Sequence, residues 1–348
     1  MKFTLASLDA LADLPFDEII DARSPSEFAE DHLPGAINLP VLSDEERARV
    51  GAIYVQESRL EARKIGAALV ARNVARHLDA HFHDKPGGYR PLIYCWRGGQ
   101  RSGSMGLILG QVGWRVGVLD GGYRTYRRMV SAALYGDAFP WRLVLLDGNT
   151  GVAKTDVLKA LPDAQMVDLE GLANHRGSVF GGFADSPQPE QKAFESALWQ
   201  AFAPLDPARP VLVEAESSKI GRLLLPPALW KAMCAAPRIE ITAPLDARAA
   251  YLTRAYADIV DDTDRLADII ERLRDLHPAE RRERWHALAA EGAVTALARD
   301  LMESHYDAAY ARQRGRHPDP VSTIAGRTLD PADIDRIAAE VAAAVKEL

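Results

Sequence analysis

Short apolar runs alternate with longer stretches of helical periodicity over the first 135 residues. Residues 61–82 and 103–113 have apolar side chains at helical spacing. The runs with the length and composition of strands, bounded by turn residues, are residues 16–23, 35–40, 91–96 and 116–122. This alternation predicts a mainly parallel sheet covered by helices, which is an α/β domain.

A second α/β pattern begins at residue 142. Its predicted strands are residues 142–148, 164–171, 210–217 and 238–243, and from about residue 245 to the C-terminus the pattern is helical. Between the two patterns, residues 134–141 (LYGDAFPW) contain the Gly, Asp and Pro of a connector. We therefore predict two domains, residues 1–138 and residues 139–348, which agrees with the length of the chain.

The composition is that of a globular protein, with 47% apolar and 26% charged residues. No apolar run is long enough to span a bilayer, and residues 1–16 lack the charged start, long apolar stretch and cleavage site of a secretion signal. We therefore expect a cytoplasmic protein without membrane contact. Two cysteines make no disulfide framework, and a reducing compartment would keep Cys95 available for chemistry. Cys234 has no glycine loop or arginine nearby and is expected in the core.

The net charge of −7 argues against non-specific coating of nucleic acid but is compatible with a local basic face. Arg124, Arg127 and Arg128 stand close together beside two tyrosines and are candidates for contacts with nucleic-acid phosphates. Arginines also recur among glutamates at helical spacing between residues 272 and 284. For these, a solvated helix face with i,i+4 ion pairs is an equal alternative.

A glycine-bearing loop follows the predicted strand that ends at residue 94. Its members are Cys95, Trp96, Arg97, Gly98, Gly99, Gln100 and Arg101. A strand, a turn and a helix in this order bring backbone N–H groups and the positive end of a helix together, which favours a thiolate and a bound oxyanion. A seven-residue ring closed by arginine suits a tetrahedral oxyanion. The alternative is an inert buried thiol at a strand end.

A second loop fits the phosphate-binding pattern G-x4-G-K-[ST], except that Ala153 replaces the glycine before the lysine. The predicted diphosphate-binding residues are Gly148, Asn149, Thr150, Gly151, Val152, Ala153, Lys154 and Thr155. Amides and Lys154 would cradle a diphosphate, and Thr155 would reach a metal ion such as Mg2+. The alanine methyl restricts the backbone, which argues against a nucleotide more than against phosphate. A purely structural strand-to-helix turn is the alternative.

Polar groups near this loop supply further candidates. An acid at the end of a neighbouring strand would complete a phosphate site, and Asp168, Glu214 and Glu216 are equally placed for that role. The residues suited to a second phosphate, from a small substrate or a nucleic-acid backbone, are His175, Arg176, Lys219 and Arg222. Ordinary surface loops are the alternative for both segments.

The first 130 residues resemble the rhodanese superfamily in two segments, DARSPSEFAEDHLPGAINLP and YCWRGGQRS. The matching positions of the first segment are Asp21, Arg23, Glu27, His32, Gly35, Ala36 and Pro40. The resemblance implies that Cys95 is a nucleophile that carries a chalcogen, or that attacks a chalcogen or phosphorus centre. For His32 we expect a structural role at a turn rather than that of a base.

The whole chain resembles the bacterial tRNA 2-selenouridine synthase family, because GNTGVAKT, NHRGSVFGG, ESSKIG and SHYDAAY follow the rhodanese-like loop in this order. The resemblance implies a transferase that acts on the wobble uridine of tRNAs that read lysine, glutamate and glutamine codons. Geranyl diphosphate first alkylates the sulfur of 2-thiouridine, and selenophosphate then supplies selenium while the geranylthio group leaves. No tightly bound cofactor is expected. An alkylated sulfur leaves as a thiol, whereas a thiocarbonyl sulfur is a poor leaving group.

This resemblance suggests separate tasks for the two loops. The 148–155 loop would hold the diphosphate of the geranyl donor, with or without Mg2+, and the Cys95 loop would accept selenophosphate. Arg124, Arg127 and Arg128, together with the arginines between residues 272 and 284, would hold the tRNA backbone.

Two other functions fit parts of the sequence. A cysteine phosphatase or arsenate reductase has the same C-x5-R spacing, although Tyr94 stands where many phosphatases carry histidine and the second domain would have no task. A regulatory module driven by ATP or GTP, with a rhodanese-like part that only binds, is the other alternative. Ala153 argues mildly against it.

Overall fold

The computed structural model describes residues 1–348 except 137–138, 162, 179–180, 184–185, 261 and 309–318. Contacts within the chain divide it into two compact units. The N-terminal unit comprises Met1–Gly136 and Glu190–Trp199, and the C-terminal unit comprises Asp137–Pro189 and Gln200–Leu348. The domain boundary expected at residue 138 lies outside the described residues.

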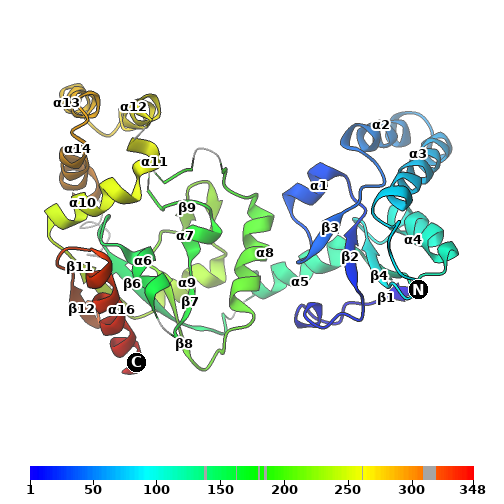
Figure 1. The fold of residues 1–348 in the computed structure, drawn as a ribbon, viewed down its shortest axis with the longest axis horizontal. Helices are drawn as coiled ribbons and strands as arrows, with labels where there is room; N and C mark the ends of the chain where they lie inside the picture. Colours follow the sequence, from blue (N-terminus) through cyan, green and yellow to red (C-terminus); the bar gives the residue numbers. More distant parts are fainter. Residues whose placement is uncertain (137–138, 162, 179–180, 184–185, 261, 309–318) are drawn as a thin grey trace. The chain divides into compact units, whose positions relative to one another are not determined.

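The N-terminal unit is built on a five-stranded sheet of order β1-β5-β4-β2-β3. The strands are β1 (Lys2–Phe3), β2 (Glu18–Asp21), β3 (Ala36–Asn38), β4 (Pro91–Tyr94) and β5 (Gly117–Leu119). Each neighbouring pair is parallel. The carboxyl ends of all five strands therefore meet at one edge, and the predicted parallel α/β arrangement is confirmed (Figure 1).

Helices alternate with these strands. They are η1 (Asp9–Leu11), α1 (Pro25–Glu30), α2 (Asp44–Gln56), α3 (Arg59–Ala80), α4 (Gln100–Val112) and α5 (Tyr123–Tyr135). Ser43 caps α2, because its Oγ accepts from the Glu46 amide at 3.2 Å while the Glu46 carboxylate accepts from the Ser43 amide at 2.9 Å. Val74 of α3, Met105 of α4 and Ile93 of β4 share one buried core. Burial of these apolar faces fixes α4, and with it the loop at its start, against the sheet.

The first part of α8 (Gln191–Phe202) belongs to the N-terminal unit, although it comes late in the sequence. Glu195 is 2% exposed and accepts hydrogen bonds from Arg127 and from Tyr135 Oη. Ser196 Oγ donates to Asp31 at 2.9 Å. These contacts join residues far apart in the chain, so the spacing of residues along the sequence carries no information about them.

The C-terminal unit has a second five-stranded sheet, of order β12-β11-β6-β8-β7, in which all neighbours are parallel. Its strands are β6 (Arg142–Gly148), β7 (Gln165–Val167), β8 (Pro210–Glu214), β11 (Arg238–Thr242) and β12 (Ser322–Ala325). A hairpin of β9 (Lys219–Ile220) and β10 (Leu223–Leu224) stands apart. Strand β12 corrects the expectation of helix from residue 245 onward: Ile324 is buried between exposed neighbours, and so short an alternation is lost among helical segments.

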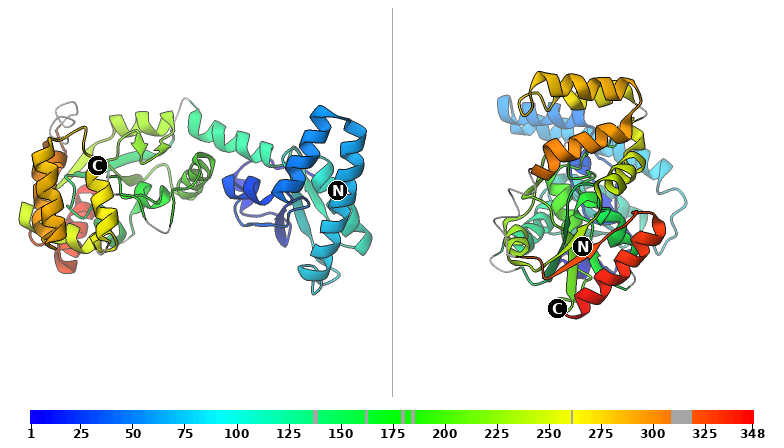
Figure 2. Two further views of the ribbon diagram at one scale, coloured as in Figure 1. Left: turned by 90° about the horizontal axis from the view of Figure 1, so that it is seen from above. Right: turned by 90° about the vertical axis from the view of Figure 1, so that its left-hand side faces the viewer.

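The helices of this unit form two groups. In the residues that the structure describes they are α6 (Lys154–Ala160), α7 (Leu169–Leu172), α9 (Pro227–Ala235), α10 (Leu245–Ala255), α11 (Ala257–Val260), α12 (Thr263–Glu271), α13 (Ala279–Ala290), α14 (Val294–Leu301), the π-helix η2 (Met302–Tyr306) and α16 (Pro331–Lys346). Helices α6 and α16 share a core with the sheet. Helices α11 to α14 form their own apolar cluster around Trp285, and the right-hand view of Figure 2 shows the orange helices of this cluster apart from α16, in red.

Two smaller expectations can be compared with the structure. Cys234 is exposed, so its expected burial in the core is wrong; Leu229 and Met233 occupy the buried face of α9, and Cys234 follows on the other face. Among the described residues, no helix combines the length and the apolar character needed to cross a membrane.

Candidate functional site

Cys95 lies directly after β4, and the N-terminus of α4 follows five residues later. The residue is 4% exposed. Its Sγ accepts hydrogen bonds from the Gly99 amide at 3.3 Å and from Ser102 Oγ at 3.2 Å. Two donors therefore hold the Sγ atom at a helix N-terminus, where backbone N–H groups favour a bound anion.

The turn between β5 and α5 holds the Cys95 loop in shape. Gly122 has a φ of +57°, and a Cβ there would lie 2.1 Å from the carbonyl oxygen of Cys95. The Tyr123 amide donates to the same oxygen at 2.9 Å, and the Arg124 amide donates to the Trp96 carbonyl at 3.1 Å. Sequence analysis did not assign Gly122 or Tyr123 to this site. The paired glycines of DGGYR were the available signal, since they permit this close approach.

Arg101 is paired with Glu27 of α1. The two Nη atoms of Arg101 lie 2.5 and 3.2 Å from the carboxylate oxygens of Glu27, whose side chain is 10% exposed. Burial would raise the pKa of Glu27, but the hydrogen bond from Arg101 and the charges of Arg101 and Arg47 outweigh it and lower this pKa. An oxyanion in the loop must therefore share the guanidinium with an ionised carboxylate.

The remaining loop residues face different surroundings. Arg97, Gly99 and Gln100 are exposed, and Trp96 packs on Tyr123 with 5.3 Å between ring centroids. The side chains of Gln100 and Arg101 also border a cavity of about 300 Å3 that extends to α2 and α3. The Cys95 loop is thus covered on one side by the turn at Gly122 and borders a cavity on the side of α2 and α3.

Three residues of the first rhodanese-like segment make structural contacts close to the Cys95 loop. Asp21 and Arg23 form a fully buried ion pair, with Nη2 and Oδ2 2.6 Å apart. His32 Nδ1 is 2.9 Å from the Phe28 carbonyl, and its ring stacks on that of Phe28. These contacts agree with the expected structural role of His32.

The second loop, Gly148–Thr155, joins β6 to α6. Ala153 adopts the left-handed conformation, with φ 61° and ψ 33°, that a glycine would take at this place in the motif. Lys154 Nζ donates to the Gly148 carbonyl at 3.0 Å, across the loop. The loop borders a cavity of about 590 Å3, which is large enough for a diphosphate and more.

Glu170, which sequence analysis did not name, is the acid that contacts Thr155. Thr155 Oγ1 donates to Glu170 Oε2 at 3.2 Å. Among the three acids that were named, Asp168 caps α7 and pairs with Lys159, and Glu214 is fully buried and accepts from the Leu169 amide at 2.9 Å.

Glu216 also lines the cavity and lies beside Glu170. Burial, followed by the charge of Glu170, raises the pKa of Glu216 to about 8. One of these two carboxyl groups therefore holds a proton at neutral pH, and it can donate that proton to a phosphate oxygen.

The residues proposed for a second phosphate separate into two pairs. His175 and Arg176 line the cavity, and the Arg176 guanidinium lies 4.2 and 4.7 Å from the ring centroids of Phe183 and Tyr256. Burial and the neighbouring Arg176 lower the pKa of His175. Lys219 and Arg222 do not border the cavity, and Arg222 donates to the Gln188 carbonyl at 2.9 Å.

The arginines expected to hold tRNA differ in exposure. Arg124 and Arg128 are exposed, whereas Arg127 pairs with the buried Glu195 and is 20% exposed. Between residues 272 and 284, Arg282 pairs with Glu271 at 2.8 Å and Arg284 with Asp300 at 3.1 Å. Both ion pairs join α13 to a neighbouring helix, so they are not the i,i+4 pairs of the alternative expectation.

The phosphate loop has oxygen ligands that suit Mg2+, in Thr155, Glu170 and Glu216. In the part of the chain that the structure describes, no group of three or more His, Cys, Asp or Glu side chains could hold a metal ion. The residues present therefore fit Mg2+ only when phosphate oxygens complete its shell, as Mg2+ sites usually require.

Two family models match the chain, the rhodanese-like domain over residues 4–129 and the tRNA 2-selenouridine synthase AAA domain over residues 141–276. The chain is 39% identical over 247 residues to the tRNA 2-selenouridine synthase of Hahella chejuensis, covering 68% of this chain and 63% of that protein. Identity to the same-named protein of Shewanella halifaxensis is 38% over 244 residues, covering 68% and 65%. For Shewanella denitrificans it is 38% over 265 residues, covering 74% and 69%.

The matched region spans slightly less than two thirds of the first two relatives and slightly more than two thirds of the third. Each matched domain contains one of the two loops described above: Cys95 lies in the first domain and Lys154 in the second. The chain therefore belongs to the tRNA 2-selenouridine synthase family.

Proposed function

We propose that this protein is a transferase that converts 2-thiouridine at the wobble position of tRNA to 2-selenouridine through an S-geranyl intermediate. The observation that carries the proposal is the presence, in one member of this family, of two loops with the strand-to-helix geometry that favours a bound anion. Each loop lies at the carboxyl end of a central parallel strand and the start of a helix. One contains a thiol, and the other contains a lysine beside carboxyl groups.

The first step takes place at the 148–155 loop, with geranyl diphosphate as the donor. The sulfur of 2-thiouridine attacks C1 of the geranyl group, the C–O bond breaks, and pyrophosphate leaves with the bonding electrons. Lys154 and the loop amides stabilise the charge on the departing oxygen. The protonated carboxyl of the Glu170–Glu216 pair supplies a proton to pyrophosphate, and solvent takes the N3 proton of the base. A Mg2+ ion held by Thr155 and Glu170 would neutralise further phosphate charge.

The second step takes place at the Cys95 loop, with selenophosphate as the donor. Loop amides and Arg101 hold the phosphate oxygens, and the selenium attacks C2 of the alkylated base. Geranylthiol leaves with a proton, and water then cleaves the P–Se bond to release phosphate. Cys95 contacts the selenium during delivery. The ionised Glu27 carboxylate is paired with Arg101, so it competes with the oxyanion for the guanidinium.

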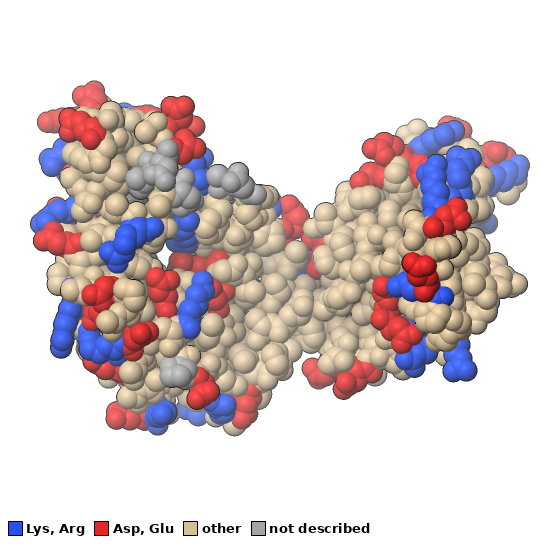
Figure 3. Space-filling model, viewed as in Figure 1, with Lys and Arg blue, Asp and Glu red and all other residues tan. Residues whose placement is uncertain are grey.

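Basic side chains on α2 and α3 offer a surface for tRNA beside the Cys95 loop. The exposed ones are Arg47, Arg49, Arg59, Arg63, Lys64, Arg72 and Arg76. Figure 3 shows Lys and Arg gathered over these two helices, with acidic groups between them. Arg63 also borders the cavity that Gln100 and Arg101 share, so the basic surface and the loop are continuous. Exposed Arg124 and Arg128 extend the same proposal to α5.

The experiment that tests the function uses the full chain with tRNA that carries 2-thiouridine and reads lysine, glutamate or glutamine codons. Nucleosides are analysed by mass spectrometry after addition of geranyl diphosphate, and again after selenophosphate. We expect S-geranyl-2-thiouridine first and 2-selenouridine second, with tRNA affinity falling steeply as salt rises. Failure to form either nucleoside, combined with turnover of a generic phosphate ester, would favour the phosphatase alternative.

A further inference from the structure

An apolar pocket adjoins the phosphate-loop cavity of the C-terminal unit. Its volume is about 70 Å3, enough for the centres of several water molecules. Its inner wall is made of Ile259, Leu266, Val294, Leu297, Leu301 and Met302. The pocket is partly open rather than sealed in the core, so its apolar walls can receive a ligand from outside, as the walls of small-molecule sites usually do.

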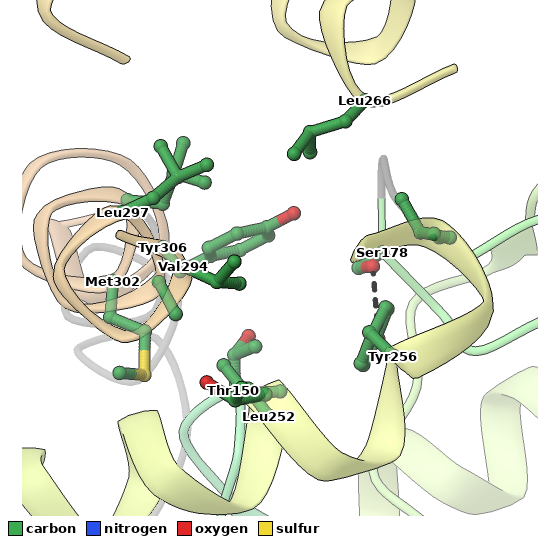
Figure 4. Close-up of a pocket in the computed structure, with 13 residues that line it drawn as sticks. Thr150, Ser178, Leu252, Tyr256, Leu266, Val294, Leu297, Met302 and Tyr306 are labelled. Atoms are coloured by element: carbon green, nitrogen blue, oxygen red, sulfur yellow. Dashed lines mark hydrogen bonds between the residues drawn. The ribbon is translucent and has the colours of Figure 1, made fainter. Parts of the chain in front are cut away.

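The pocket and the phosphate-loop cavity share a wall. The residues that line both are Thr150, Ser178, Leu252, Tyr256 and Tyr306. In Figure 4, Thr150 and Leu252 lie at one end of the pocket and Leu266 at the other, while the hydrogen-bonded Ser178 and Tyr256 face Leu297 and Met302. A ligand bound at Thr150 therefore has a short apolar path toward Leu266.

A buried arginine joins the phosphate loop to the pocket wall. Arg248 Nε donates to the Thr150 carbonyl at 2.9 Å, and its Nη2 lies 2.7 Å from Asp307, directly after η2. The residue is 5% exposed. The position of the loop at Thr150 is thus coupled to the π-helix that carries Met302 and Tyr306, and π-helical turns are often found at functional sites.

From this continuity of a phosphate cradle and an apolar pocket we infer that the pocket holds the hydrocarbon chain of a prenyl diphosphate and limits its length. The inference rests on the proposed function, because it assigns the tail of the donor whose head the 148–155 loop would bind. The limited volume favours a ten-carbon chain over a fifteen-carbon chain, and Leu266 lies at the end of the pocket away from Thr150, where it would meet the tail of the chain.

Binding to the full chain is measured by calorimetry with inorganic pyrophosphate and with dimethylallyl, geranyl and farnesyl diphosphates. Burial of several methylene groups predicts that geranyl diphosphate binds at least tenfold more tightly than pyrophosphate. Leu266→Trp shortens the pocket, so it should cost geranyl diphosphate at least tenfold in affinity and leave pyrophosphate within twofold. Unchanged pyrophosphate binding also shows that the variant is folded.

A second pair of variants tests the length limit. Leu266→Ala should improve the affinity of farnesyl relative to geranyl diphosphate at least fivefold. Ile270→Ala removes a buried aliphatic side chain of the same cluster that does not line the pocket, and it should leave this ratio unchanged. The inference is overturned if geranyl diphosphate binds no more tightly than pyrophosphate, or if Leu266→Trp lowers both affinities equally or neither.

The proposed function fails differently. If the Leu266 variants change the chain-length preference but no tRNA is alkylated, the inference about the pocket is supported and the proposed function is wrong. If tRNA is alkylated with the same chain-length preference in all variants, the function stands and the pocket is wrong.

Discussion

The Cys95 loop and the Gly148–Thr155 loop have the same secondary-structure context and different surroundings. Each follows a buried parallel strand and precedes a helix, so each presents amides to an anion. The Cys95 loop is packed beneath by the Gly122 turn, and Arg101 is already paired with Glu27. The other loop borders a cavity of about 590 Å3. The backbone amides therefore favour an anion at both loops. The surrounding side chains determine how large the anion can be and which chemical group it can carry.

The largest effect is expected when the support of the Cys95 loop is removed. Gly122→Ala places a methyl group 2.1 Å from the Cys95 carbonyl in a left-handed conformation, so the loop must move. Selenium transfer should fall by about 100-fold, by analogy with loss of an oxyanion-binding donor, and geranyl transfer should stay within twofold. Nucleoside analysis measures both. Gly87→Ala is the control, because nothing lies within 4 Å of its Cβ position. Equal loss of both transfers would erase the distinction between the loops.

The second effect concerns pH and is confined to the C-terminal unit. Because the pKa of Glu216 rises from 4.5 to about 8 on folding, the folded state keeps a proton that the unfolded state has lost. Glu216 should therefore contribute a fall in stability as pH rises between those values, of up to about 1.4 kcal/mol per pH unit. Urea unfolding at several pH values measures this slope. In Glu216→Gln the slope should flatten, and an unchanged slope would show that another group is responsible.

A smaller effect is expected from the carboxylate that competes at the Cys95 loop. Glu27→Gln keeps the shape of the side chain and removes a negative charge beside Arg101, so thiophosphate should bind about tenfold more tightly. Glu30→Gln, on the same helix and paired with Lys192, is the matched control. Calorimetry distinguishes the outcomes. Weaker binding in Glu27→Gln would mean that Glu27 prepares Arg101 for the anion rather than competing for it.

The smallest effect is expected from replacing Ala153, which stands where the phosphate-loop motif has glycine. Ala153 already has the conformation of the usual glycine, so Ala153→Gly should change pyrophosphate affinity less than threefold. Ala153→Val should weaken it at least tenfold, because a β-branched residue strongly disfavours a positive φ. A tenfold gain in Ala153→Gly would show instead that the alanine impairs the loop.

Sequence patterns locate both loops because each stands at the end of an apolar run, where local spacing is informative. The carboxyl group at Thr155 was not predictable in the same way. Glu170 is brought to Thr155 by the short helix α7, which Asp168 caps. In the sequence, Asp168 stands closer than Glu170 to the end of the predicted strand, so it was named as a candidate acid and Glu170 was not. Glu27 was identified in the sequence only as a position that matches the rhodanese-like segment. Its ion pair with Arg101 was not predictable, because tertiary packing brings the two residues together.

Elements without a local signal were missed for physical reasons. Strand β12 is short and depends on pairing with β11. The contact of Glu195 with Arg127 joins segments far apart in the chain, which periodicity cannot match. The apolar pocket cannot be predicted from the sequence, because leucines that line a pocket have the same helical spacing as leucines that fill a core.

The central claim, that the two loops perform separate steps, is tested most directly by product analysis with Cys95→Ser and Lys154→Ala. On 2-thiouridine tRNA with both donors, Cys95→Ser should accumulate S-geranyl-2-thiouridine and form no 2-selenouridine. Lys154→Ala should form neither nucleoside, yet it should convert tRNA that already carries the geranyl group. If folded Cys95→Ser loses both products, or if folded Lys154→Ala fails on geranylated tRNA, the division between the loops is contradicted.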